Sequence, residues 1–198
     1  MKAAAVFLLA AIAVATGPAA AAEPSAVAEL VDVTNRVCHS QATDPLGFDG
    51  TPDQDEQFMK ANKLAYGLSP GTLERFGPDA QGILSRSIMG SRESGGDLIV
   101  LSIGGAFSRC KTMLLSPTDE AVGDEAASAF ASSSLRWKEA PATNTPGAPL
   151  QKRMFISRDE AGQAYLLNMF TTTVPNSQLR LLTTVNLIPA NVELPEGF

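Results

Sequence analysis

The segment Gly67-Leu68-Ser69-Pro70-Gly71 has the Gly-x-Ser-x-Gly spacing of the turn that presents a nucleophilic serine in α/β-hydrolases. In that turn the residue after the serine donates its backbone N–H to the oxyanion. Here that residue is Pro70, which has no N–H. The only histidine, His39, precedes the serine, whereas the hydrolase order places it last. We therefore interpret Ser69 as the cap of a short helix that begins with Pro70.

A second serine, Ser108, precedes Lys111 by three positions, which is the Ser-x-x-Lys spacing of penicillin-recognising enzymes. That spacing joins two side chains on a helix, but on a strand positions three apart point to opposite faces. The run Ala106–Leu115 reads as a strand, so no Ser–Lys site is expected. A hydrolase with a site assembled from separated residues stays open as an alternative, and its candidates are Ser69, Ser108 and His39.

Carboxylates gather early in the chain, where oxygen-rich clusters could bind calcium. They are Asp44, Asp49, Asp53, Asp55 and Glu56. An EF-hand loop starting at Asp53 would need glycine at its sixth position, which is Phe58. One histidine and two cysteines are too few for a standard zinc site, and no phosphate loop, dinucleotide fingerprint or haem motif is present. We predict no metal and no cofactor.

The chain has two cysteines, Cys38 and Cys110, and neither belongs to a Cys-x-x-Cys pair. Outside the cytoplasm two lone cysteines commonly pair. We predict a disulfide between them, with free thiols as the alternative.

Basic side chains concentrate in the later half of the chain. They are Arg109, Lys111, Arg136, Lys138, Lys152, Arg153, Arg158 and Arg180. On strands, Arg109 and Lys111 share one face, and Lys152 and Arg158 share another. If these faces adjoin, the four residues form a cationic patch for a small anionic ligand or a partner protein. The alternative is the ordinary solvated side of an antiparallel sheet.

The segment Met1–Ala22 has the order of a cleavable signal peptide, with Lys2, a 13-residue apolar run and small residues at Ala20–Ala22. The run is too short to span a bilayer, so no transmembrane anchor is expected after cleavage. Its alanine-rich style resembles bacterial export signals and predicts a periplasmic or secreted protein. Without Lys2, 14 basic residues face 21 acidic ones, for a formal charge of about −7, which disfavours nucleic-acid binding.

Hydrophobic periodicity predicts helices, then a mainly β half with one inserted helix. The expected helices are Pro24–Ser40, Thr51–Tyr66, a short turn from Ser69 to Phe76, Pro78–Met89 and Ser116–Ser134. The expected strands are Asp97–Ile103, Ala106–Leu115, Leu150–Ser157, Ala164–Thr173 and Gln178–Ile188. The first two strands are joined at Gly104-Gly105 as a hairpin, and Ser91–Gly96 and Lys138–Pro149 are expected loops.

This pattern predicts an α+β fold with an antiparallel sheet of about five strands, in a single domain spanning residues 23–198. No internal repeat is visible in the sequence. The absence of a convincing catalytic set favours a non-enzymatic exported protein that binds a ligand or an envelope partner through its sheet face. The alternatives are the hydrolase described above and a structural subunit of the bacterial cell envelope.

Overall fold

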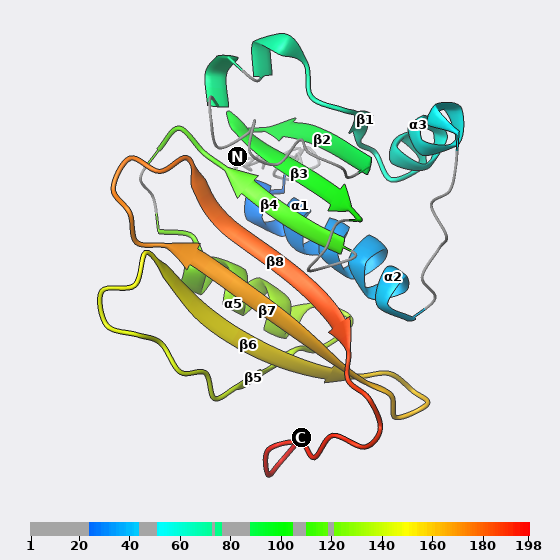
Figure 1. Ribbon diagram of the computed structural model, residues 1–198, viewed down its shortest axis with the longest axis vertical. Helices are drawn as coiled ribbons and strands as arrows, with labels where there is room; N and C mark the ends of the chain where they lie inside the picture. Colours follow the sequence, from blue (N-terminus) through cyan, green and yellow to red (C-terminus); the bar gives the residue numbers. More distant parts are fainter. Residues whose placement is uncertain (1–23, 44–50, 73, 77–87, 105–109, 119–120) are drawn as a thin grey trace, which may run out of the picture.

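The computed structural model describes residues 24–43, 51–72, 74–76, 88–104, 110–118 and 121–198. Within them, eight strands form one antiparallel sheet in the order β1-β2-β3-β4-β8-β7-β6-β5 (Figure 1). The strands are β1 (Ala65–Tyr66), β2 (Ile88–Ser94), β3 (Asp97–Ile103), β4 (Cys110–Leu115), β5 (Lys138–Ala140), β6 (Leu150–Arg158), β7 (Ala164–Thr172) and β8 (Leu179–Leu187). The α+β prediction with a mainly antiparallel sheet is confirmed, but the expected number of about five strands is wrong.

Strand β2 is the largest difference from the expected elements. The sequence predicts a helix over Pro78–Met89 and a loop over Ser91–Gly96. Residues 77–87 lie outside the described part of the chain, but the residues from Ile88 onward form a seven-residue strand paired with β3. Gly95 and Gly96 have φ values of 59° and 98°, so they make the tight turn of a β2–β3 hairpin.

Gly90 lies inside β2 and does not end a helix, because helix α3 (Pro52–Ala61) approaches this strand closely. A Cβ atom on Gly90 would lie 2.6 Å from the Sδ atom of Met59 and 3.0 Å from the Cβ of Leu64. The glycine is therefore a packing requirement between helix and sheet.

Three further boundaries differ from the prediction. The expected helix Thr51–Tyr66 ends at Ala61, which leaves room for β1, and β5 forms inside the expected loop Lys138–Pro149. Helix α5 (Gly123–Ser132) starts later than the expected Ser116. The N–H of Ser116 donates to the carbonyl of Gln178 at 2.8 Å and so extends the pairing of β4 with β8. Residues 105–109, including the second half of the Gly104-Gly105 turn, lie outside the described residues.

The N-terminal helix runs continuously from Ala26 to Thr43 as α1 (Ala26–Val33), a π-helical turn η1 (Thr34–Cys38) and α2 (His39–Thr43). It begins at Ser25, whose side chain accepts a hydrogen bond from the N–H of Ala28. Its buried side chains recur at helical spacing along one face. The buried residues are Val27, Leu30, Val31, Val33, Thr34, Val37 and Cys38.

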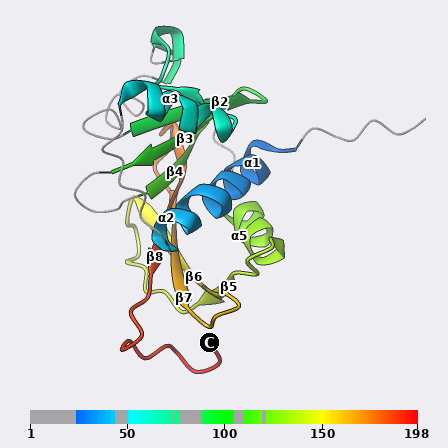
Figure 2. The ribbon, with the colours of Figure 1, turned by 90° about the vertical axis from the view of Figure 1, so that its right-hand side faces the viewer.

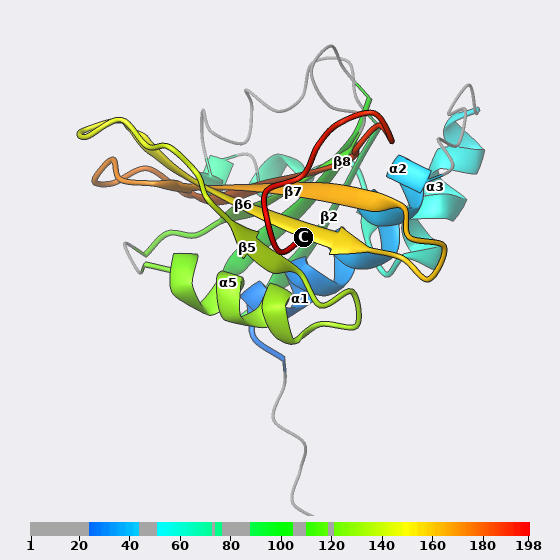
Figure 3. The ribbon, with the colours of Figure 1, turned by 90° about the horizontal axis from the view of Figure 1, so that it is seen from below.

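One face of the sheet is covered by α1, η1, α2 and α5, which lie together on the same side (Figures 2 and 3). Between these helices and the sheet lies the main core, which includes Trp137, Phe130, Phe155 and Tyr165, each no more than 1% exposed. Because α1 and α5 also contact each other, both halves of the sheet share this core.

The topology has two similar halves. Helix α1 precedes the meander β2-β3-β4, and α5 precedes the meander β6-β7-β8. The last strand of each half, β4 and β8, pair antiparallel at the centre of the sheet. This similarity is one of element order, and the sequence shows no matching repeat.

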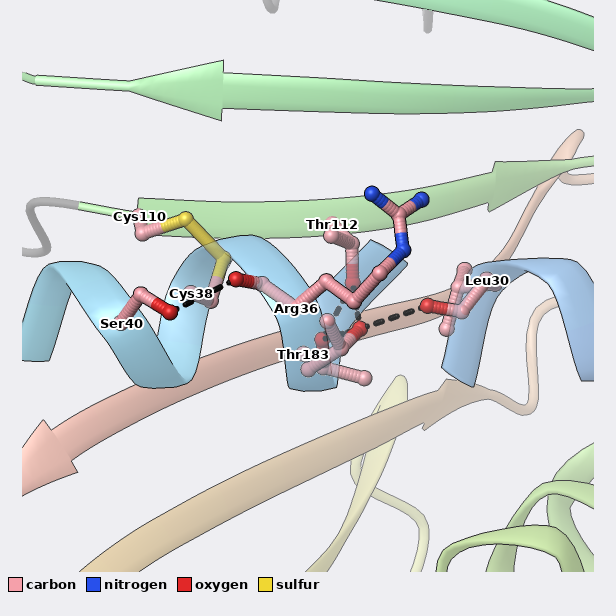
Figure 4. The surroundings of a disulfide bond; sticks show 8 residues. Leu30, Arg36, Cys38, Ser40, Cys110, Thr112 and Thr183 are labelled. Atoms are coloured by element: carbon pink, nitrogen blue, oxygen red, sulfur yellow. Dashed lines mark hydrogen bonds between the residues drawn. A yellow bond between two sulfur atoms is a disulfide. The ribbon is translucent and has the colours of Figure 1, made fainter. Parts of the chain in front are cut away.

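The disulfide and three buried threonines join the N-terminal helix to the two central strands (Figure 4). Cys38 in η1 bonds to Cys110 at the start of β4, with the two Cα atoms 5.2 Å apart. One helical turn earlier, the hydroxyl of Thr34 lies 2.6 Å from that of Thr112 in β4 and 3.3 Å from that of Thr183 in β8. Each of these three hydroxyls is buried and has a partner, so the polar groups carry no desolvation penalty.

We predict that the Cys38→Ala/Cys110→Ala double variant is less stable by about 4 kcal/mol, because the bond closes a 72-residue separation in the unfolded chain. Urea unfolding of the oxidised wild type against the double variant measures this difference. Wild-type protein held in reductant is the control and should unfold like the variant. Equal unfolding midpoints for oxidised wild type and variant would show that the bond contributes nothing.

Candidate functional site

The sheet face opposite the helices is covered only at its ends by described residues. At one end, residues 70–72 and 74–76 are helical, and Phe76 packs with Leu98, Val100 and Met113. At the other end, Leu194 and Phe198 of the C-terminal tail pack against the cluster around Ile156. Between these two covers lies a half-buried area of β4, β8, β7 and β6 on which no described helix packs.

We call this area the open sheet face and define it by nine half-buried residues. They are Lys111, Lys152, Met154, Leu166, Asn168, Phe170, Leu182, Thr184 and Asn186. The strand register places all nine on one side, because Thr112 and Thr183 face the helices and strand side chains alternate. None of the nine is acidic.

The register arranges most of these side chains in two adjacent rows across four strands. In the first row, Lys111 is followed by Thr184, Asn168 and Met154. In the second row, buried Met113 is followed by Leu182, Phe170 and Lys152. Each row therefore has a lysine at one end, on opposite sides of the face, with amide, hydroxyl and apolar groups between them. Mixed apolar and polar surface of this kind is typical of transient protein interfaces.

The predicted cationic patch is partly assembled. Lys111, Lys152 and Arg158 all lie on the same face of the sheet, whereas Arg109 lies outside the described residues. The Arg158 guanidinium donates to the carbonyl of Gly162, in the turn between β6 and β7, at 2.8 Å and to the carbonyl of Phe198, in the C-terminal tail, at 3.4 Å.

The spacing of the two remaining lysines decides which ligand this face suits. Strands β8 and β7 separate Lys111 from Lys152, a distance of roughly 14 Å between backbones at about 4.8 Å per strand. One small anion cannot contact both ammonium groups across that distance. The Lys152 ammonium also lies 5.9 Å from the ring centroid of Phe170, which keeps it over the face. The geometry suits an extended partner surface better than a single small ion.

The candidate hydrolase residues do not come together. The hydroxyl of Ser69 accepts a hydrogen bond from the N–H of Thr72 and lies 2.8 Å from its hydroxyl, as expected for a helix cap. His39 packs in the other half of the sheet, against Tyr165 of β7. Ser108 lies outside the described residues.

His39 belongs to a cluster of aromatic and polar side chains at the end of α2. Its ring centroid lies 4.3 Å from that of Tyr165 and 6.5 Å, edge-on, from that of Trp137. The Tyr165 hydroxyl donates to Asp159 at 3.0 Å and accepts from Thr43 at 3.2 Å. The Nε2 atom of His39 is buried and has no hydrogen-bond partner among the described residues. Burial lowers the pKa of His39 below its usual 6.5, and the charge of Asp159 only partly opposes this.

The acidic segment does not form a metal site in the part of the chain that is described. Asp44 and Asp49 lie outside it, while Asp53, Asp55 and Glu56 occupy the first turns of α3. There the Thr51 N–H donates to the Gln54 side chain at 3.2 Å, as in a capping box. Among the described residues, no three acidic, histidine or cysteine side chains converge, and no helix is long and apolar enough to cross a bilayer.

Comparison with known proteins gives no relative from which a role could be transferred. No family model, no curated protein and no solved structure matches the chain.

Several residues of the open sheet face were not singled out from the sequence. Asn168, Phe170 and Met154 lie on strands whose alternation was weak, so their face could not be assigned. On β8 the structure places Leu182, Thr184 and Asn186 on the half-buried side, whereas Arg180 and Ile188 near the two ends of the strand are buried and Leu187 is exposed.

We predict that His39 makes stability depend on pH. Because its pKa is lower in the folded state, the unfolded chain takes up the proton first as the pH falls. The stabilisation is therefore fully present above about pH 6.5 and declines as the pH falls below it. Urea unfolding at roughly pH 5 and roughly pH 7.5 should show a smaller loss of stability for His39→Gln than for wild type. An identical pH dependence in the two proteins would contradict the assignment.

Proposed function

We propose that this protein is an exported, non-enzymatic binding domain whose open sheet face docks an envelope protein with an acidic surface. The observation that carries the proposal is charge segregation. The chain has an excess of acidic residues, with a formal charge of −6, yet the open sheet face has two lysines and no carboxylate. A face with this composition attracts a negatively charged partner, although the protein as a whole has a net negative charge.

The composition of the face supports a protein partner. Met154, Leu166, Phe170 and Leu182 are half-buried apolar side chains. Met154 and Leu166 already pack against the cluster around Ile156, and Leu182 packs against the cluster around Phe76. A partner would remove their remaining exposed area from water, which contributes roughly 25 cal/mol per Å² of apolar area. Asn168, Thr184 and Asn186 lie between them and supply hydrogen-bonding groups that fix the orientation of the partner. The two lysines at the rim would mainly raise the association rate and exclude basic partners.

Export is supported by two independent features. The segment Met1–Ala22 has the charge, apolar run and small residues of a cleavable leader. A disulfide bond such as Cys38–Cys110 is typical of proteins that fold in an oxidising compartment. A periplasmic or secreted location therefore agrees with an envelope partner.

The proposal is tested by a photo-crosslinking amino acid placed at Leu182 in the full chain, expressed in its native host. We expect one predominant adduct with an acidic envelope protein. The same crosslinker at exposed Ser128 on α5, on the helix side of the sheet, is the positional control and should not give this adduct.

The charge requirement is tested by Lys111→Glu/Lys152→Glu. This variant should reduce the adduct and weaken binding of the purified partner by about tenfold or more, with a reduced salt dependence. Lys60→Glu/Lys63→Glu changes the net charge equally at α3 and its following turn, and should bind like wild type. The proposal is wrong if Leu182 gives no adduct, if the adduct is a second copy of this chain, or if the two charge reversals have equal effects.

A further inference from the structure

A second candidate site lies where the start of α5 meets the turn between β7 and β8 (Figures 1 and 3). A cleft of about 520 Å³ opens there, a volume suited to a small molecule. We call it the α5 cleft and define it by five of its lining residues, which are Gly123, Asp124, Arg153, Thr171 and Arg180. It is separate from the open sheet face, and its binding chemistry does not depend on the proposed partner.

Two guanidinium groups from different strands line the α5 cleft. Arg180 is only 7% exposed although it carries a charge. It occupies a β-bulge, because Leu114 pairs with Leu181 while the next residue, Leu115, pairs with Leu179. A bulge re-aims the side chain of its extra residue. Because of the bulge, the Arg180 side chain departs from the in-and-out alternation of β8 and lines the cleft.

Arg153 is held in place by Glu139 and still presents one nitrogen to the cleft. Its Nε and Nη2 atoms donate to the two carboxylate oxygens of Glu139 at 2.7 and 2.6 Å. This bidentate contact lowers the pKa of Glu139 and orients the guanidinium plane. The remaining nitrogen, Nη1, donates to Asp124 at 2.8 Å.

The Asp124 carboxylate is the more exposed of the two carboxylates that pair with Arg153, whose Nη1 also donates to the Gly123 carbonyl at 3.4 Å. Its side chain is fully exposed, and exposed ion pairs contribute little to stability. It can rotate into solvent at small cost and leave Nη1 to another anion. Asp124 therefore occupies the place that the carboxylate or phosphate group of a ligand would take.

The start of α5 adds the positive end of a helix dipole to the same cleft, beside the carboxylates of Asp124 and Glu125 in its first turn. Among the described residues, no side chain caps this ten-residue helix. Its first N–H groups have no partner within the helix and form the positive end of its dipole. Gly123 allows β7 to approach, because a Cβ there would lie 3.1 Å from the Cγ2 of Thr171. The Thr171 hydroxyl adds a neutral donor beside the helix start.

We infer that the α5 cleft binds a small molecule through one carboxylate or phosphate group, held between Arg153 and Arg180 in competition with Asp124. The ligand chemistry follows from two guanidiniums, which suit planar or tetrahedral oxyanions. The cleft is larger than one such group, so the rest of the ligand would contact Val122, Val174 and Pro175.

Titration calorimetry with succinate and with inorganic phosphate as separate probes tests this inference and distinguishes the two oxyanions. We expect wild type to bind at least one probe. Arg153→Gln and Arg180→Gln should each weaken binding by about tenfold or more. Asp124→Asn should tighten it by about twofold to fivefold, because the competing carboxylate is removed.

Arg158→Gln is the matched control, because it removes an arginine from the same strand but outside the cleft and should leave binding unchanged. Thermal unfolding of each variant identifies any that fail to fold. The exposed Asp124→Asn variant keeps the test decisive even if Arg180→Gln unfolds. The inference is overturned if wild type binds neither probe, if Arg158→Gln and Arg153→Gln lose affinity equally, or if Asp124→Asn binds no more tightly than wild type.

Discussion

The attachment of the N-terminal helix to the two central strands is the constraint on which the rest of the structure depends. Cys38 bonds to β4, and one turn away Thr34 joins β4 and β8 through Thr112 and Thr183. A π-helical turn at η1 contains both contacts. Such turns insert one residue into the helical spacing and frequently occur where a helix must present particular side chains. The covalent bond thus secures the first half, and the hydroxyl network extends the attachment to the second.

This attachment decides which face of the sheet is available to other molecules. With α1, α2 and α5 packed on one side, the aromatic core is closed and the opposite side keeps its strand side chains partly in contact with solvent. Among the described residues, the tail and the helical turn ending at Phe76 cover only the ends of that side. A sheet with one packed and one solvated face is common among antiparallel folds. The choice of polar, apolar and basic residues on the solvated face is what makes this one a candidate interface.

The sequence predicts correctly those helices and strands whose hydrophobic spacing matches the side on which they are buried in the structure. The helix expected over Pro24–Ser40 and the strands expected over Ala164–Thr173 and Gln178–Ile188 follow from local spacing, and the structure has a helix and strands at these places. Strand β2 was missed because Gly90 ends a helical pattern convincingly. In the structure Gly90 allows close packing against Met59. This contact joins residues distant in sequence, so the local pattern does not show it. Short strands such as β1 and β5 have too few residues to show any period.

The candidate sites were less predictable than the fold, for a physical reason. The sequence identifies Arg153 and Arg180 as basic residues, but their convergence depends on a bulge in β8 and on where α5 begins. Likewise, whether Lys111 and Lys152 share a face depends on the strand register, which the hydrophobic pattern specifies only where one side is deeply buried.

If the chain is exported, as proposed, it emerges from the membrane N-terminus first, and the two-half topology then has a consequence for folding. Both cysteines belong to the first half, while β8, the partner of β4, is among the last segments to emerge. The crosslink can therefore close before the second meander is translocated, and β4 is then already fixed when β8 arrives. The first half would act as an oxidised template on which the later strands are added, so the slow long-range pairing of β4 with β8 starts from one ordered edge.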